Sequence, residues 1–331
     1  MRTEIPILHE TLLSKHPEAD NVLAINEDVY ALLMNSLLRE DMTKTAQPHL
    51  IVGEAGCGKT FLIKRLYGTI EKDMNKTLHP IVMEGKSLYS TDDIWNQCAS
   101  LLDIECGKEC FNNLLEWQER NLKRIVLLID NIQYYFNRTD NTEQYGLRGK
   151  LNRAGAPMLI ASSEKVLTAF TEYNAAFFDG FKITYFKPIS MSTAANIIDK
   201  QYDVARLEKI MSHLPKTIRS MFIAIEILEK SNDTGKDLAF LSDYFYSHYQ
   251  EKFDTSTIQV QRLLSALAQA DAGLNLAEIR ERTKQENSRI SPYLKLMTDQ
   301  KTIKKEAKTA RGGIYSIMDP LFKLWLQHNI I

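Results

Sequence analysis

The chain has 331 residues, of which 44% are apolar and 25% charged, and its formal net charge is −1. This length exceeds one domain of about 100–200 residues, so we expect two or three domains, each with a core. No apolar run approaches the roughly 20 residues of a membrane-spanning helix, and the acidic N-terminal segment lacks the pattern of a secretory signal. We therefore expect a cytoplasmic protein that does not act in a membrane.

Charge is unevenly distributed along the chain. Residues 255–331 carry twelve Lys or Arg and seven Asp or Glu, and the segment 301–311 has five basic residues and one acidic residue. A basic end on a near-neutral protein suggests a polyanionic partner, although such runs are usually solvated faces.

The four cysteines give no zinc-ligand spacing with histidine. Cys106 and Cys110 are close enough in sequence to pair, but without a secretory signal we expect reduced thiols.

The N-terminal part alternates apolar strands with amphipathic helices. Nearly all residues of the strands are apolar, which predicts a parallel five-stranded sheet covered by helices on both faces. The first turn of the helix 91–102 is acidic, and we expect Thr91 to cap it. The predicted strands span 49–52, 79–84, 124–130, 156–163 and 181–186; the predicted helices span 26–40, 61–70, 91–102, 108–123 and 147–155.

After residue 188 the pattern becomes helical, with segments 190–202, 204–213 and 216–230 and then a polar stretch at 231–237. A further long helix is followed, from about residue 257, by three helices, a strand, an Arg-Gly-Gly turn, a strand and a last helix. This order is typical of a winged helix-turn-helix. We therefore predict three domains: an α/β domain with an N-terminal segment 1–47, a helical lid, and a winged helix, covering 1–188, 189–254 and 255–331.

The segment GEAGCGKT fits the spacing G-x-x-x-x-G-K-[ST] of a P-loop and lies between a predicted strand and a predicted helix. Its glycines let backbone N–H groups turn toward phosphates at the positive end of the following helix. We expect Lys59 to reach the β- and γ-phosphates of ATP, or the β-phosphate of ADP, and the hydroxyl of Thr60 to bind Mg²⁺. The predicted nucleotide-binding residues are Gly53, Glu54, Ala55, Gly56, Cys57, Gly58, Lys59, Thr60 and Phe61.

The strand 124–130 ends in Asp130, at the position where P-loop ATPases place the acid that holds Mg²⁺ through water. The next residue is Asn131, where most ATP-hydrolysing relatives have Glu. An amide can orient a water but cannot accept its proton, so we expect weak basal hydrolysis. Gln133 and Glu84, the latter at the end of another strand, are alternative partners for the attacking water.

The strand 156–163 ends in Ser162 and Ser163, next to the strand that bears Asp130. Ser162 can bond the γ-phosphate or the attacking water. Alternatively, either serine caps a following helix with Glu164 in its first turn.

These motifs, followed by F-x-P-I-S-x-x-x-A before the helical lid, resemble the AAA+/STAND branch of P-loop ATPases. More narrowly, the chain is similar to origin-recognition initiators and archaeal-type ATPases over roughly residues 25–328. The tail Y-x-I-x-D-P-L-F-x-x-W, from Tyr315 to Trp325, is similar to the ending of the archaeal-type ATPases.

The resemblance implies a residue of the lid that contacts the γ-phosphate from a G-x-P-R motif. The matching stretch here is His213-Leu214-Pro215-Lys216, so Lys216 replaces the arginine and Arg219 lies one turn later. Either can serve as the sensor. Arg148 and Arg153 are candidates for a finger acting on a neighbour's nucleotide, or lie on a solvated helix face.

In a winged helix the third helix usually enters the major groove and the wing follows the backbone of the duplex. The Ser291-Pro292 pair falls inside that helix or at its start, where it is consistent with an N-cap and a first-turn proline. The residues expected to contact DNA are Arg289, Tyr293, Lys295, Lys304, Lys305, Lys308 and Arg311.

We therefore expect an ATP–Mg²⁺-dependent switch that couples nucleotide state to double-stranded DNA binding, to homo-oligomer formation, or to both. A protein partner remains unspecified. The alternatives are a STAND-type signalling or defence ATPase whose winged helix binds protein, and a chaperone-like ATPase that does not bind DNA.

Overall fold

The computed structural model describes residues 26–39, 44–107, 109–190, 192, 194, 203–231, 236–270, 272–309 and 312–330. The chain divides into two compact units, Met1–Asp199 with Lys216–Met221, and Lys200–Pro215 with Phe222–Ile331. The predicted helix 190–202 lies almost entirely outside the described residues. The three-domain division predicted from the sequence stays a prediction.

The first unit is built on a parallel five-stranded sheet with the order β2-β3-β4-β1-β5. All seven residues of β3 are buried, because both faces of the sheet are covered. Every predicted strand is present, and the ends of β1 and β3 match the prediction to the residue. The strands are β1 His49–Val52, β2 Leu78–Glu84, β3 Arg124–Asp130, β4 Met158–Ser163 and β5 Lys182–Tyr185.

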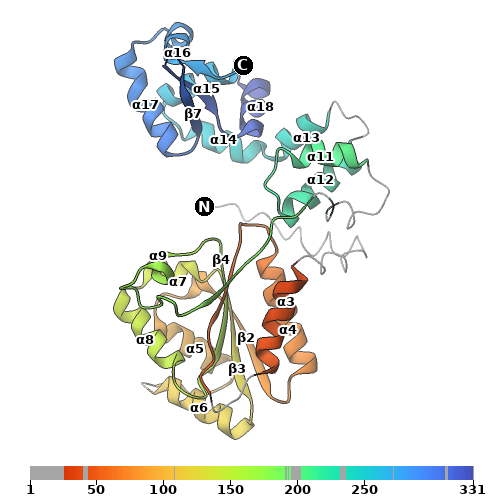
Figure 1. Cartoon of the computed structure of the whole chain (residues 1–331), viewed down its shortest axis with the longest axis vertical. Helices are drawn as coiled ribbons and strands as arrows, with labels where there is room; N and C mark the ends of the chain where they lie inside the picture. Colours follow the sequence, from red (N-terminus) through yellow and green to blue (C-terminus); the bar gives the residue numbers. More distant parts are fainter. Residues whose placement is uncertain are drawn as a thin grey trace. The chain divides into compact units, whose positions relative to one another are not determined.

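Alternate residues of β3 face opposite layers of helices. Ile125, Leu127 and Ile129 pack in one apolar core, and Val126 and Leu128 pack in the other. Figure 1 shows α3 and α4 on one side of the sheet and α5, α6 and α8 on the other. The helices of this unit are α3 Glu27–Leu38, α4 Lys59–Asp73, the 3₁₀ turn η1 Gly85–Ser87, α5 Thr91–Leu101, α6 Cys110–Asn121, α7 Gln133–Arg138, α8 Asn141–Leu151 and α9 Thr168–Thr171.

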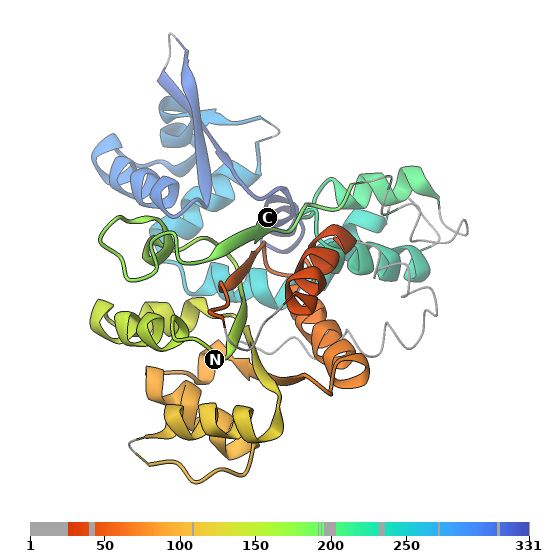
Figure 2. The ribbon, with the colours of Figure 1, turned by 60° about the horizontal axis from the view of Figure 1, so that its bottom comes forward.

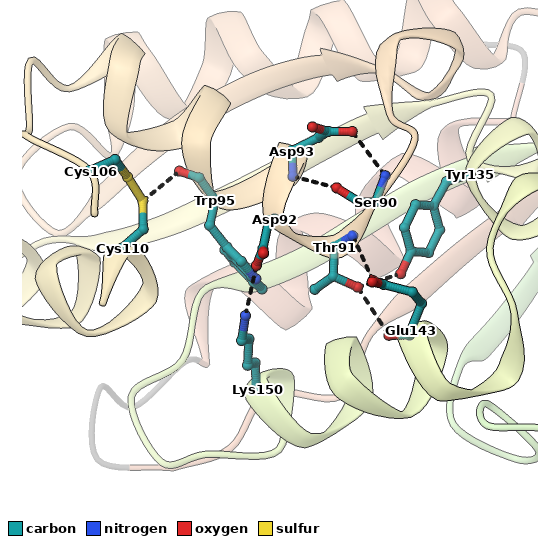
Figure 3. Close-up of polar contacts among 10 residues, drawn as sticks. All are labelled: Ser90, Thr91, Asp92, Asp93, Trp95, Cys106, Cys110, Tyr135, Glu143 and Lys150. Atoms are coloured by element: carbon teal, nitrogen blue, oxygen red, sulfur yellow. Dashed lines mark hydrogen bonds and ion pairs between the residues drawn. A yellow bond between two sulfur atoms is a disulfide. The ribbon is translucent and has the colours of Figure 1, made fainter. Parts of the chain in front are cut away.

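The start of α5 differs from the prediction. Its N-cap is Ser90, whose side chain accepts from the N–H of Asp93, while the carboxylate of Asp93 accepts from the N–H of Ser90. Thr91 instead bonds the hydroxyl of Tyr135 and the carbonyl of Glu143 (Figure 3). The expectation that Thr91 caps the helix is wrong, because this side chain is used to hold α5 against α7 and α8.

The structure joins Cys106 and Cys110 in a disulfide at the entrance to α6 (Figure 3). Their Cα atoms lie 4.8 Å apart, inside the range that a disulfide spans. The expectation of reduced thiols is therefore wrong for this pair, whereas Cys57 and Cys98 are free.

The second unit contains helices of the predicted lid and the predicted winged helix. An antiparallel sheet with the order β6-β8-β7 accompanies α15, α16 and α17, and Figure 2 shows the blue-violet strands of its hairpin side by side. This order of elements confirms the winged-helix fold. The elements are α11 Val204–Met211, α12 Ile218–Lys230, α13 Asp237–Tyr244, α14 Tyr246–Asp254, α15 Ile258–Ala268, β6 Leu274–Asn275, α16 Leu276–Thr283, α17 Asn287–Asp299, β7 Ile303–Thr309, β8 Gly312–Ile317 and α18 Pro320–Asn329.

The residues of the C-terminal motif have structural roles. Asp319 caps α18 by accepting from the N–H groups of Leu321 and Phe322, and Pro320 occupies the first helical turn. Tyr249 of α14 donates to the carboxylate of Asp319 at 2.9 Å, and Trp325 is fully buried. The motif therefore fixes α18 against α14 within this unit.

Helix α17 begins at Asn287 with Glu286 at its N-cap, and Pro292 lies inside it. Of the two placements left open for Ser291-Pro292, inside the helix or at its start, the structure shows the first, so Ser291 is not the N-cap. A proline there removes only one N–H of the helical ladder, and the burial of Ile290, Leu294 and Met297 holds the helix in place.

Within the part of the chain that the structure describes, every helix is too short or too polar to span a membrane.

Candidate nucleotide-binding site

The predicted P-loop connects the end of β1 to the start of α4. Gly56 and Gly58 have φ angles of 82° and 102°, a region that favours glycine. The N–H of Gly53 donates to the carbonyl of Ser163, which joins the start of the loop to the end of β4. Because α4 begins at Lys59, its free N–H groups and the positive end of its dipole face the loop, an arrangement suited to phosphate.

Lys59 is almost fully buried inside this loop. Its ammonium group donates to the carbonyl oxygens of Gly53 at 2.6 Å and Glu54 at 2.9 Å, and lies 3.8 Å from the sulfur of Cys57. Burial raises the pKa of the Cys57 thiol, so the neutral form is favoured next to Lys59.

Thr60 and Asp130 meet at the carboxyl edge of the sheet. The hydroxyl of Thr60 donates to Asp130 Oδ2 at 2.5 Å, although the two residues come from α4 and β3. A hydroxyl and a carboxylate are the hard oxygen donors that Mg²⁺ prefers. Among the described residues no group of three or more His, Cys, Asp or Glu side chains could hold a metal.

Ser162 lies on the other side of Asp130. Its hydroxyl donates to Asp130 Oδ1 and accepts from the N–H of Asn131 at 3.0 Å. Ser163 bonds the carbonyl of Lys165 at 2.7 Å, and the next helix begins only at Thr168. The alternative that these serines cap a helix is therefore wrong, and Ser162 instead fixes the orientation of the Asp130 carboxylate.

Asn131 follows β3 with a φ of 56°, which asparagine adopts more readily than most residues. Its amide nitrogen donates to the Glu84 carboxylate, at 3.1 Å to Oε1 and 3.4 Å to Oε2. Gln133 donates to Asn131 Oδ1 at 3.4 Å. The structure thus brings together the three residues that the sequence left as alternatives.

The start of α12 belongs to the same unit as the P-loop. The N–H of Arg219 donates to the carbonyl of Gly56 at 3.1 Å, and a Cβ atom on Gly56 would lie 2.8 Å from the Cβ of Arg219. Lys216 is tied through its carbonyl to the N–H of Ile189. Of the two sensor candidates, Arg219 is the one that packs directly against the loop.

Arg148 and Arg153 are both engaged within the first unit. Arg148 donates to the carbonyl of Ala176 at 2.6 Å, and Arg153 donates to Asn112 Oδ1 at 2.9 Å. Arg153 also lines a cavity of about 430 Å³ with Trp95, Phe111 and Lys150, among other residues. None of the predicted nucleotide-binding residues lines this cavity, so it is separate from the P-loop site.

The predicted DNA contacts lie on the winged helix of the second unit. Arg289, Lys295, Lys304 and Lys305 are exposed and Tyr293 is half-buried. Lys304 pairs with Glu306 at 2.6 Å, and the ammonium group of Lys305 lies 5.5 Å from the ring centre of Tyr315. Arg311 and the side chain of Lys308 lie outside the described part of the chain.

Helical geometry divides these residues into two groups. At 3.6 residues per turn, Arg289 and Tyr293 share one face of α17, whereas Lys295 lies about 160° around the helix from Tyr293. A groove that receives Arg289 and Tyr293 therefore does not receive Lys295 on the same face.

Comparisons with known proteins agree with this fold and loop. A family model described as an AAA domain matches residues 41–162, which contain the P-loop, Asp130 and Ser162. The chain resembles the AAA+ P-loop ATPases, and its fold, a parallel sheet followed by a C-terminal winged helix, is similar to that of the origin-recognition initiators. A search of the curated proteins finds no match.

Three solved structures are similar over nearly the whole chain. The ORC2 protein of Aeropyrum pernix is 13% identical with a TM-score of 0.54, covering 92% of this chain and 93% of its own. The ORC1 protein of the same organism is 14% identical with a TM-score of 0.52, covering 95% of this chain and 93% of its own. A Walker-type ATPase of Pyrococcus abyssi is 16% identical with a TM-score of 0.51, covering 91% of this chain and 95% of its own. At these identities the comparison shows a shared fold.

Proposed function

We propose that this protein binds ATP with Mg²⁺ and acts as a nucleotide-dependent switch on double-stranded DNA. The observation that carries this proposal is the convergence of Lys59, Thr60 and Asp130 on one phosphate-binding loop. Lys59 and the N–H groups of the loop bind the phosphates. Thr60 and Asp130 hold the ion, which neutralises charge on the phosphate oxygens.

Helix α12 supplies the route by which the nucleotide state reaches the second unit. Its first turn bonds the P-loop through Arg219 and Gly56, and the same helix continues into the unit that contains the winged helix. A nucleotide that displaces Arg219 therefore acts on a helix shared by both units. The same switch also accounts for self-assembly of the protein when it binds nucleotide or DNA.

The DNA part of the proposal is supported by the exposed basic residues of the winged helix. The similar ORC1 protein of Aeropyrum pernix was solved in complex with DNA, and ORC2 in ADPNP–ADP complexes. Nucleotide-driven assembly without affinity for DNA would instead favour the signalling alternative or the chaperone-like alternative.

The test is equilibrium titration of MgATP into the whole chain. Replacing Lys59 with Ala removes the ammonium group from the loop, so we expect binding to be lost. Lys64→Ala, on the exposed face of the same helix, is the matched control and should bind as the wild type does. Wild-type affinity in the Lys59→Ala variant would show that the site assignment is wrong.

A further inference from the structure

Glu84 lies beside the candidate metal site although it is far from Asp130 in sequence. It ends β2, which pairs in parallel with β3, and the register places Glu84 opposite Asp130. Both side chains thus emerge at the carboxyl edge of the sheet, one strand apart, where the P-loop also lies. This places a second carboxylate beside Asp130 at the edge of the sheet that carries the P-loop.

The Glu84 carboxylate is held by a chain of two amides. A carboxylate only accepts hydrogen bonds, so the group of Asn131 that faces it is the NH₂, at 3.1 Å and 3.4 Å from the two oxygens. The carbonyl oxygen of Asn131 then faces Gln133, whose NH₂ donates to it at 3.4 Å. Gln133 is buried, and its position therefore sets which way the Asn131 amide points.

The backbone makes this pairing possible. A Cβ atom on Gly85 would lie only 2.3 Å from the carbonyl oxygen of Asn131, so the residue after Glu84 must be glycine for the two strand ends to approach. The left-handed conformation of Asn131 turns its side chain away from the direction that a continued strand would give. Both features bring the amide to Glu84.

We propose that Glu84 is the catalytic base of ATP hydrolysis and that Asn131 and Gln133 are its positioning residues. This inference rests on the proposed nucleotide-binding function. The oxygen of a water molecule bonds to the γ-phosphorus, and the bond from that phosphorus to the bridging oxygen of ADP breaks. Glu84 accepts the proton that the water loses and later returns it to solvent. The products are ADP and inorganic phosphate.

Compared with most ATP-hydrolysing relatives, which have Glu directly after the Mg²⁺-binding Asp, this chain has the amide at that position and the carboxylate on the neighbouring strand. An amide at position 131 cannot take a proton, but it can hold a carboxylate without neutralising it. Asn131 alone predicts slow hydrolysis because it cannot act as a base. In this proposal Glu84 supplies that base, so the rate of hydrolysis depends on Glu84.

The experiment measures single-turnover ATP hydrolysis with the whole chain in excess over nucleotide, together with the Kd for MgATP. Glu84→Gln keeps the shape and removes the base, so we expect the rate to fall about 10²–10⁴-fold with an unchanged Kd. The control is Glu172→Gln, which removes the same charge from an exposed position and should leave the rate unchanged. Asn131→Ala should lower the rate with an unchanged Kd.

A double exchange tests the pairing itself. Glu84→Asn combined with Asn131→Glu returns a carboxylate next to Asp130, and it should hydrolyse ATP at least tenfold faster than Glu84→Asn alone. Such rescue shows that the two strand ends present a carboxylate and an amide to the same water in either order. An exchange variant that is no faster than Glu84→Asn alone overturns the pairing, and Asn131→Ala with a wild-type rate overturns the positioning role.

The outcomes separate this inference from the proposed function. A wild type that does not bind MgATP contradicts the nucleotide site. A wild type that binds MgATP without releasing phosphate above the Lys59→Ala background overturns the role of Glu84 and leaves the nucleotide site standing. Glu84→Gln with wild-type rate and Kd also overturns it.

Discussion

At the scale of single residues, Arg206 and Asp237 form an ion pair inside the second unit. Two nitrogens of Arg206 donate to the two carboxylate oxygens of Asp237 at 3.0 Å and 2.6 Å, and Asp237 has no exposed surface. We expect Arg206→Ala to lower the free energy of unfolding of this unit by about 3–5 kcal/mol, because it leaves a buried carboxylate without its partner. Chemical denaturation measures the change.

The control for this variant is Lys230→Ala, which breaks an exposed pair with Glu226 and should cost no more than about 1 kcal/mol.

The stabilisation that the Arg206–Asp237 pair contributes depends on pH in a direction that follows from the pKa of Asp237. Arg206 lowers the pKa of Asp237 below its ordinary value of 3.8. The stabilisation is therefore fully present above that value and is lost as the pH falls through the folded pKa. Equal losses in the free energy of unfolding for Arg206→Ala and Lys230→Ala would contradict the prediction.

The residues of the site were predictable from the sequence to different extents. Lys59, Thr60 and Asp130 follow from local spacing, because a P-loop and the end of a buried strand are recognised within a few residues. The bond between Asn131 and Glu84 depends on β2 and β3 being neighbours. The order of strands in a sheet cannot be predicted from a local pattern. The sequence therefore made Glu84 one candidate partner of the attacking water but could not select it.

At the scale of elements, the strands were predicted better than the starts of the helices. An uninterrupted apolar run such as β3 has ends marked by polar residues, and its burial on both faces leaves no competing arrangement. A helix start depends on which of two adjacent polar residues caps it. Thr91 was expected to cap α5, but its side chain contacts Tyr135 of α7 and Glu143 of α8, and Ser90 is the N-cap.

This gives a prediction for α5. Ser90→Ala removes the side chain that accepts from the N–H of Asp93, so the first unit should lose about 0.5–2 kcal/mol of stability. Ser87→Ala is the control, because its hydroxyl bonds only exposed groups outside α5's first turn. Thermal unfolding of both variants is the measurement. A loss for Ser87→Ala as large as for Ser90→Ala would show that the capping box contributes little.

At the scale of the whole molecule, the proposed function requires communication between the candidate nucleotide site in one unit and the winged helix in the other. Composition predicted two or three domains, and the basic excess predicted where a polyanion would bind. The sequence could not assign the start of α12 to the nucleotide unit, because that assignment comes from packing of Arg219 against Gly56 and not from any break in the helical pattern. The shared helix is the physical basis for expecting ATP to alter DNA binding.

The dependence of DNA affinity on salt is the measurement that tests this coupling. Each phosphate neutralised by Lys or Arg releases condensed counterions, so affinity should fall by about 0.9 log unit per log unit of salt for each contact. Replacing Lys304, Lys305 and Lys308 with Ala should flatten that slope by up to about three contacts and weaken binding to all sequences alike. Because Lys304 is paired with Glu306, we expect it to contribute the least of the three.

Base reading would have a different signature on the same duplexes. Arg289→Ala should cost about 1–3 kcal/mol at one base position and relax specificity there, whereas Lys295→Ala, on another face of α17, should leave specificity unchanged. The titrations are made at two salt concentrations, with and without ATP, for the wild type and the Lys59→Ala variant. ATP should change the wild-type affinity only. Absent or salt-independent binding in every case would contradict DNA as the partner and indicate that the wing docks on a protein.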